Sequence, residues 1–395
     1  MSLGRDTGSK LVDPLQSLRL REEFQGLYIH VPFCSSRCSY CDFATDLEAG
    51  SDRQDYLDGL CDEMENYAHL SLRIDTIYFG GGTPSLLKPS TIHRIIEKVR
   101  NTWRDSPIDE VTLESNPETL DPDSVKSFIA AGINRFSVGI QTFCENELRV
   151  LGRKHLSSQN HLALQTLQEQ GVRFNTDLMV GIPLQTRASV DKNLQYLQGY
   201  EASHISVYML SVEEGAPWFE AIKKEKLRPL EEKLAVELYR HCIDRLHSKN
   251  LCHYEVSAFA RQGEECRHNL KYWKNWEFLG LGPSAASYLD CRRFQNQRTL
   301  KKWISQLKGQ EPYENFAHIS SKNAILDTIM LRFRLMEGLQ ASQLEEWEEH
   351  FPTLRIFHRL SKLQERGLIK KQAMRYRLTD QGLLFANEVF LEFLD

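Results

Sequence analysis

A regular alternation of strand-like and helix-like segments most constrains the fold of this chain. Six short β-branched or apolar runs are each followed by a polar turn and a stretch with helical spacing, such as Gln54–Leu70 or Pro89–Arg100. The runs are Leu27–Val31, Thr76–Phe79, Glu110–Leu113, Arg135–Val138, Phe174–Val180 and His204–Leu210. Strand–helix alternation implies parallel strands joined by right-handed crossovers. Because a complete TIM barrel has eight such units, we expect an α/β fold with a partial TIM-like (β/α)6 barrel over residues 22–250.

The pattern changes on either side of this core. Residues 1–21 form a short N-terminal extension, and residues 251–300 are less regular and rich in aromatic residues and glycine, which favours a linker. Residues 301–395 contain three helical stretches, Asn323–Leu335, Ala341–His350 and Leu354–Arg366. Two strand-like pieces and a last helix from Thr379 follow them. This order predicts a C-terminal winged-helix-like domain of ordinary small size.

Composition excludes several classes of protein. The chain has 395 residues, 41% hydrophobic and 26% charged, which is typical of a soluble globular protein. No apolar run approaches the roughly 18–20 residues of a membrane span, so no integral membrane segment is expected. The first residues lack an apolar signal stretch and carry Asp6, Asp13, Glu22 and Glu23, which predicts a cytoplasmic location. The net charge of −5 gives no general attraction to nucleic acid.

Three of the nine cysteines crowd into residues 34–41, and the other six are scattered. Cys34, Cys38 and Cys41 follow the first predicted strand with C-x3-C-x2-C spacing. Thiolates are soft ligands that suit zinc and iron–sulfur clusters. A structural zinc site needs four ligands, so zinc would require His30 or a distant cysteine as the fourth. Three cysteines instead leave one iron of a cubane open to a chelating ligand, and this interpretation is favoured over zinc and over chance clustering.

Polar residues and glycines follow the next four predicted strands. The second strand ends in Gly80, Gly81, Gly82 and Thr83, where the absence of side chains admits a close ligand and exposes backbone N–H groups. The later strand ends supply Glu114, Gln141, Arg153 and Asp177. Each residue alone has an ordinary alternative, a helix-capping acid for Glu114 or a surface loop for the others. Their recurrence at successive strand ends predicts one binding site there.

The cysteine spacing in this position resembles the radical-SAM superfamily. The resemblance implies a [4Fe–4S] cluster whose open iron chelates S-adenosylmethionine and whose reduction cleaves it, with an electron donor such as flavodoxin or ferredoxin. The motifs resemble the oxygen-independent coproporphyrinogen III oxidases and their HemW-type relatives from about Leu27 to the C-terminus. By that resemblance, Tyr28, Gly81 and Glu114 belong to a first S-adenosylmethionine site. A second S-adenosylmethionine site corresponds to Tyr40, Gly82, Thr83, Gln141, Arg153 and Asp177. The resemblance therefore implies one or two S-adenosylmethionine molecules per protein.

Two departures separate the HemW-type relatives from the oxidases. The oxidases have a fourth cysteine two residues after the third, where this chain has Phe43, and a longer N-terminal extension. The chain also carries the HNxxYW signature of the HemW-type heme chaperones, which implies His268 and Tyr272 as heme-binding residues, with Cys266 as a further candidate. The alternative is that this motif only packs a linker against the barrel. The resemblance therefore implies a heme chaperone without oxidase activity, an unidentified acceptor protein and a homodimer.

Two other functions stay open at this level. The first is coproporphyrinogen III oxidation itself. The second is DNA binding, since Arg355, His358, Arg359, Lys362 and Arg366 lie on the third C-terminal helix, in the position of a recognition helix. The acidic net charge of the whole chain argues against the second.

Overall fold

Six adjacent parallel strands form the centre of the molecule. The computed structural model describes residues 23–45 and 53–394, so the predicted extension of residues 1–21 lies outside the described residues. The strands follow one another in chain order across a 12-stranded sheet. They are β1 (Gln25–Val31), β2 (Ile74–Gly81), β3 (Glu110–Ser115), β4 (Arg135–Gln141), β5 (Arg173–Val180) and β6 (His204–Met209). The predicted partial (β/α)6 barrel is confirmed.

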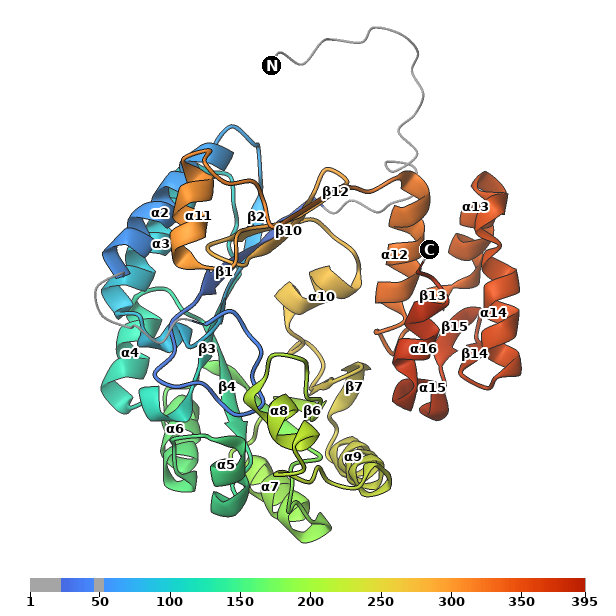
Figure 1. The fold of residues 1–395 in the computed structure, drawn as a ribbon, viewed down its shortest axis with the longest axis horizontal. Coiled ribbons are helices and arrows are strands. Elements are labelled where there is room, and N and C mark those ends of the chain that lie inside the picture. Colours follow the sequence, from blue (N-terminus) through green and yellow to red (C-terminus); the bar gives the residue numbers. More distant parts are fainter. Residues whose placement is uncertain (1–22, 46–52, 395) are drawn as a thin grey trace, which may run out of the picture.

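Helices cover the outer face of these strands and form the curved wall on the left and at the bottom of Figure 1. They are α2 (Arg53–Tyr67), α3 (Pro89–Thr102), α4 (Pro122–Ala130), α5 (Glu145–Leu151), α6 (Ser157–Glu169), α7 (Arg187–Gly199) and α9 (Glu232–His247). In α3, Ile92, Ile95, Ile96 and Val99 recur at helical spacing and are all buried, so the helix packs one apolar face on the sheet. Short helix α8 (Pro217–Lys223) and 3₁₀ turns at Pro84–Leu86 and Pro117–Thr119 follow strand ends.

Residues 251–318 extend the sheet at both edges, although the sequence pattern favoured a linker over residues 251–300 and a winged-helix-like domain from residue 301. Strands β7 (Cys252–Glu255) and β8 (Ala258–Ala260) pair beyond β6, and β9 (Phe278–Leu281) pairs in parallel with β1. Strands β10 (Ala286–Leu289), β11 (Arg292–Gln295) and β12 (Asn315–His318) continue from β9, and α11 (Leu300–Leu307) packs on α2. These strands have three or four residues each, too short for a clear periodic pattern.

Helix α10 (Arg267–Trp273) lies between the barrel strands and the C-terminal domain in Figure 1. It contacts the amino-terminal parts of the first strands: His268 approaches Gly26 in β1 and Thr76 in β2, and its backbone N–H donates to Glu110 at the start of β3. The helix therefore closes the end of the barrel opposite the carboxyl ends of the strands.

A separate hydrophobic core, whose first buried residue is Ala324, organises the C-terminal part of the chain. Its helices are α12 (Ser321–Arg332), α13 (Ala341–His350), α14 (Ile356–Glu365), α15 (Asp380–Leu384) and α16 (Ala386–Leu391), with a 3₁₀ turn at Pro352–Leu354. Strands β13 (Leu339–Gln340), β15 (Arg375–Leu378) and β14 (Ile369–Gln372) form a three-stranded antiparallel sheet in that order. The helices and ribbon agree with the winged-helix-like prediction. The two-residue strand β13 and the division of the last predicted helix into α15 and α16 were not expected.

Within the part of the chain that the structure describes, no helix is long and apolar enough to cross a membrane.

Candidate functional site

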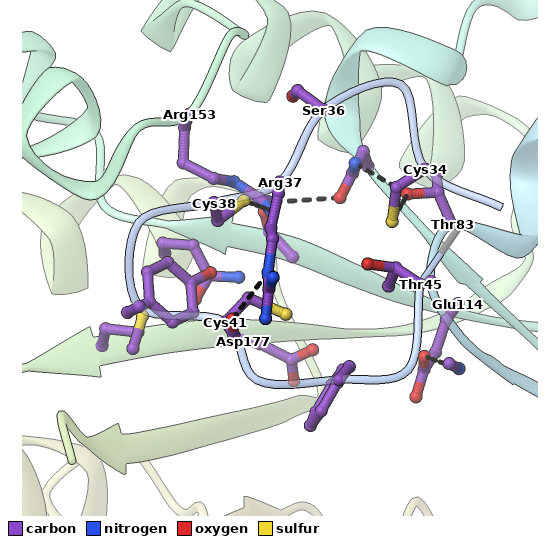
Figure 2. Close-up of a pocket in the computed structure, with 18 of the residues that line it drawn as sticks. Cys34, Ser36, Arg37, Cys38, Cys41, Thr45, Thr83, Glu114, Arg153 and Asp177 are labelled. Atoms are coloured by element: carbon purple, nitrogen blue, oxygen red, sulfur yellow. Dashed lines mark hydrogen bonds between the residues drawn. The ribbon is translucent and has the colours of Figure 1, made fainter. Parts of the chain in front are cut away.

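A cavity of about 400 Å³ opens at the carboxyl ends of the parallel strands. Figure 2 shows the cysteine loop bending around it, with Glu114 and Asp177 coming from the strands behind. Eleven residues predicted for the cluster and the cofactor line this one cavity: Cys34, Cys38, Tyr40, Cys41, Gly81, Gly82, Thr83, Glu114, Gln141, Arg153 and Asp177. The structure thus brings together side chains from the loop and from four strand ends, as the barrel topology requires.

The cysteine loop is held by backbone contacts from distant parts of the chain. The N–H of Ser39 donates to the carbonyl of Leu151 at 3.0 Å, and its carbonyl accepts from the N–H of Trp218 at 2.9 Å. The guanidinium of Arg37 donates to the carbonyl of Cys41 at 3.3 Å and to that of Gly215 at 3.1 Å. These contacts fix the path of the loop.

The cysteine thiols have different surroundings. The Sγ of Cys34 lies 3.6 Å from the hydroxyl of Thr83, and the guanidinium of Arg153 donates to the Sγ of Cys38 at 3.5 Å. Burial raises the pKa of Cys34, partly offset by the Thr83 contact, and burial also raises the pKa of Cys41. Because thiolate is the form that binds metal, assembly of a cluster here releases protons.

The donor set fits a cluster better than a single metal ion. No group of three histidine, cysteine, aspartate or glutamate side chains in residues 23–45 and 53–394 gathers closely enough to hold one ion. In a cubane each cysteine binds a different iron, so the sulfurs need not converge on one point. His30, the candidate fourth zinc ligand, has its Nδ1 3.0 Å from the Tyr28 hydroxyl and its Nε2 3.1 Å from the Ala44 carbonyl. Its imidazole is therefore not free to complete a zinc site.

The glycine turn after β2 supports the cysteine loop directly. A Cβ on Gly82 would lie 2.6 Å from the carbonyl oxygen of Phe33 and 3.0 Å from the Sγ of Cys34. Gly81 has φ of 111°, a conformation that favours glycine. The expectation of outward-facing N–H groups is wrong for this turn: Gly81 donates to Glu114, Gly82 to Val31 and Thr83 to Phe33. The glycines allow close packing of two loops, and their N–H groups fix the loops together.

Glu114 is held in the cavity by two donors. The hydroxyl of Tyr78 donates to its Oε1 at 2.8 Å, and the N–H of Gly81 donates to its Oε2 at 3.0 Å. Burial raises the pKa of this carboxyl to about 7, with a further contribution from Asp177. Each carboxylate oxygen keeps lone pairs for further bonds, so Glu114 can accept hydrogen bonds from a ligand with two neighbouring hydroxyl groups.

Arg153 and Asn116 form a polar bridge across the cavity. The guanidinium of Arg153 donates to the Oδ1 of Asn116 at 3.0 Å, and the amide of Asn116 donates to the hydroxyl of Thr83 at 3.3 Å. Asn116 was not among the predicted site residues. Its place two residues after Glu114, at the carboxyl end of β3, is the signal that would have identified it.

Asp177, Gln141 and Tyr40 complete the predicted set. The carboxylate of Asp177 accepts from the Ser137 hydroxyl at 3.2 Å and from the Asn175 amide at 3.0 Å, and burial raises its pKa. Gln141 ends β4 with φ of 60°, and the Tyr40 ring packs 6.4 Å from the Trp218 ring. These side chains surround the same cavity as Glu114. Binding measurements decide whether the cavity holds one or two ligand molecules.

Four candidate residues lie away from the cavity lining: Tyr28, Cys266, His268 and Tyr272. Tyr28 packs its ring 6.3 Å from the Tyr78 ring and places its hydroxyl on His30. His268 is fully buried, with Nδ1 2.9 Å from the Thr76 hydroxyl and Nε2 2.7 Å from the hydroxyl of Tyr272. In this conformation neither imidazole nitrogen of His268 is available to an axial position on heme. The structure does bring His268 and Tyr272 together, as their spacing of four residues on one helix predicts.

Three of the basic side chains of α14 and its C-cap have partners at the C-terminal end of the module. Arg366 pairs with Glu388, Lys362 pairs with Glu392 at 3.4 Å, and Arg359 donates to the Glu392 carbonyl. Glu388 and Glu392 therefore pair with two of the cations, Arg366 and Lys362, of the helix that a DNA-binding interpretation would use.

Family models match two parts of the chain. The model described as the radical SAM superfamily matches residues 28–197, and the HemN C-terminal domain matches residues 319–385. The second match begins directly after β12 (Asn315–His318), where the separate C-terminal core also begins.

Known relatives are similar over almost the whole length. The heme chaperone HemW of Bacillus subtilis (strain 168) is 30% identical over 377 residues, which cover 93% of this chain and 98% of that protein. Radical S-adenosyl methionine domain-containing protein 1, mitochondrial, of Bos taurus is 32% identical over 391 residues, which cover 93% of this chain and 87% of that protein. Coproporphyrinogen III oxidase (HemN) from Escherichia coli has the same fold, with a TM-score of 0.79 at 21% identity over 98% of this chain and 93% of that one. The chain therefore belongs to the HemW family of the radical SAM superfamily.

Proposed function

We propose that this protein is a heme chaperone, which binds a [4Fe–4S] cluster and S-adenosylmethionine and carries heme to an acceptor protein. One observation carries the proposal: the cysteine loop, the glycine turn and Glu114 line a single cavity, and Phe43 lines it where the oxidases have a fourth cysteine. The full-length similarity to proteins named heme chaperone HemW supports the heme-carrying part.

Cys34, Cys38 and Cys41 would hold the cluster, because they are the cysteines that line the cavity. Glu114 would accept the ribose hydroxyls of S-adenosylmethionine, and the Gly81–Gly82 turn would admit the methionyl end close to the backbone. When bound, the cluster supplies an electron for cleavage of the sulfonium. Arg153 and Asn116 keep the opposite wall polar and bridged, which favours a charged ligand over an apolar one.

The mouth of the cavity has an apolar side. Phe43 is 60% exposed, Tyr208 is 43% exposed and Met209 is 39% exposed, and all three line the cavity. A cysteine at position 43 would add a thiol at the mouth, whereas the phenyl ring adds apolar surface. We therefore favour a carrier of an apolar group over the alternative function, coproporphyrinogen III oxidation.

His268 and Tyr272 are the proposed heme residues, through their place in the HNxxYW motif. Ligation by His268 would require its Nε2 to leave the Tyr272 hydroxyl and the helix to move from the barrel. A heme-acceptor protein, an electron donor such as flavodoxin or ferredoxin, a homodimer and a cytoplasmic location complete the proposal. DNA binding is not proposed, because Lys362 on α14 and Arg366 at its C-cap pair with acidic groups and the net charge of the whole chain is −5.

A heme titration of the anaerobically reconstituted protein tests this function. We expect stoichiometric heme uptake, seen as a shifted Soret band, and release of that heme to an apo-acceptor. Replacing His268 by alanine or Tyr272 by phenylalanine is expected to change the ligand-dependent spectrum. A wild-type protein that takes up no heme would contradict the proposal, and formation of protoporphyrinogen IX from coproporphyrinogen III would favour the oxidase instead.

A further inference from the structure

The helix that carries the HNxxYW motif is connected to the cofactor cavity through one tyrosine. The His268 imidazole stacks on the Tyr78 ring with centroids 5.2 Å apart and an interplanar angle of 28°. The hydroxyl of the same tyrosine donates to the Oε1 of Glu114 at 2.8 Å. Neither His268 nor Tyr78 is among the residues lining the cavity, and the Tyr78–Glu114 hydrogen bond connects them to it.

His268 is itself fixed on every side. Its two ring nitrogens contact the hydroxyls of Thr76 and Tyr272, and its edge packs at 5.1 Å against the Tyr272 ring. Gly26 leaves space for it, since a Cβ there would lie 3.1 Å from the imidazole. The imidazole therefore has one position, which in turn restricts the ring of Tyr78.

A second ring also restricts Tyr78. The Tyr28 ring stacks against it at 6.3 Å with an interplanar angle of 27°. A Cβ on Gly80 would lie 2.8 Å from the Tyr28 ring, 3.0 Å from the Tyr78 ring and 3.2 Å from the Oε1 of Glu114. The missing side chain of Gly80 is what lets the two rings and the carboxylate meet at one place.

We propose that Tyr78 and His268 are positioning residues for the S-adenosylmethionine site: α10 fixes the Tyr78 ring, and the Tyr78 hydroxyl orients the Glu114 carboxylate toward the ligand's ribose. The Gly81 N–H holds the second carboxylate oxygen, so loss of the tyrosine hydroxyl frees one oxygen and leaves the carboxylate able to rotate. The HNxxYW motif thereby contributes to cofactor binding from the closed end of the barrel. This inference rests on the proposed binding of S-adenosylmethionine by Glu114.

Three variants of the reconstituted protein separate this role from general stability. Tyr78→Phe removes the hydroxyl and keeps the ring stack, and His268→Gln removes the stack. Tyr239→Phe is the matched control, because Tyr239 is 4% exposed and its hydroxyl donates to the Val256 carbonyl at 2.6 Å, away from the cavity lining. Calorimetric titration measures the affinity of each protein for S-adenosylmethionine and for its 2′-deoxy and 3′-deoxy analogues. Melting temperatures are recorded for all of them.

We expect Tyr78→Phe to weaken S-adenosylmethionine binding about tenfold, as loss of a hydrogen bond to a charged group does. The affinity of this variant for the deoxy analogues should fall much less. These analogues already lack a ribose hydroxyl that would contact the oriented Glu114 carboxylate. His268→Gln should show the same selective loss, and Tyr239→Phe should bind all three ligands as wild type does.

Equal weakening of all three ligands, or a Tyr78→Phe affinity equal to that of the control, would overturn the inference. A wild-type protein that binds no S-adenosylmethionine would overturn it as well. Heme uptake, measured on the same preparations, reports separately on the chaperone function: a protein that binds S-adenosylmethionine selectively through Tyr78 but takes up no heme would refute that function and leave this inference standing.

Discussion

Replacing Asp75 by asparagine removes half of a buried ion pair that holds α10 in the barrel. The ammonium of Lys271 lies 2.9 Å from the Oδ1 of Asp75, and the two side chains are 3% and 7% exposed. Lys271 also donates to the Phe24 carbonyl at 3.0 Å. After the substitution, the described contacts leave the Lys271 ammonium with two partners. They are this carbonyl and the ring of Trp276, whose centroid is 5.5 Å away.

The magnitude follows from the cost of an uncompensated buried charge. Breaking a buried pair from one side costs about 3–5 kcal/mol of unfolding free energy. Asp75→Asn should fall in that range. Lys271→Met should cost less, because Asp75 keeps Arg267 at 3.4 Å, and the Arg267 side chain is 46% exposed. The double variant leaves neither charge and should recover about 2 kcal/mol or more of the summed losses.

Urea unfolding of the four proteins of this cycle measures the coupling. Tryptophan fluorescence and circular dichroism are followed in parallel, because the described residues form more than one hydrophobic core. If the losses of unfolding free energy in the two single variants add up to the loss in the double variant within about 0.5 kcal/mol, the two side chains are not coupled and the reasoning is refuted. The same variants should bind S-adenosylmethionine more weakly, since a loosened α10 no longer fixes His268 against the ring beside Glu114.

Two further outcomes follow from packing and burial. Gly82→Ala should lower the iron content after anaerobic reconstitution several-fold, because the new Cβ would meet the Phe33 carbonyl at 2.6 Å and the Cys34 Sγ at 3.0 Å. Gly199→Ala is the control, since no atom lies within 4 Å of its Cβ, and it should load iron normally. Burial raises the pKa of Glu63 from 4.5 to about 7, so the folded state binds more protons between these values and stability falls as pH rises through them. Glu63 therefore contributes about 3 kcal/mol to the difference in unfolding free energy between about pH 5 and about pH 8. Glu63→Gln should lack this difference, and a pH dependence equal to that of the wild type would contradict the prediction.

The part of the site built from consecutive strand ends could be predicted from the sequence. Glu114 directly follows the predicted run Glu110–Leu113, and Asp177 lies within the run Phe174–Val180. Local pattern alone therefore assigns the two carboxylates to the carboxyl-terminal halves of β3 and β5. Parallel pairing in chain order then brings them to one edge of the sheet. Cys34 follows the same rule from the end of β1.

The contacts that come from outside this repeat could not be predicted in the same way. Strand β9 pairs with β1 across some 250 residues of chain, and four-residue strands carry too little periodicity to reveal a partner. The place of α10 at the closed end of the barrel depends on Gly26 and Thr76, which offer His268 room and a hydroxyl group. Nothing in the spacing of HNxxYW distinguishes such a buried position from an exposed heme ligand.

Helix α10 closes one end of the barrel and is connected to the cavity at the other end. The cavity lies at the carboxyl ends of the strands and the HNxxYW helix at their amino ends, with β2 in contact with both through Thr76 and Tyr78. A heme that draws His268 out of the barrel would release the ring that orients Glu114, so the two ligands would oppose one another. By linkage, S-adenosylmethionine would then weaken heme binding by the same factor. If heme binds elsewhere, at the apolar mouth beside Phe43 for example, α10 stays in place and this opposition is absent.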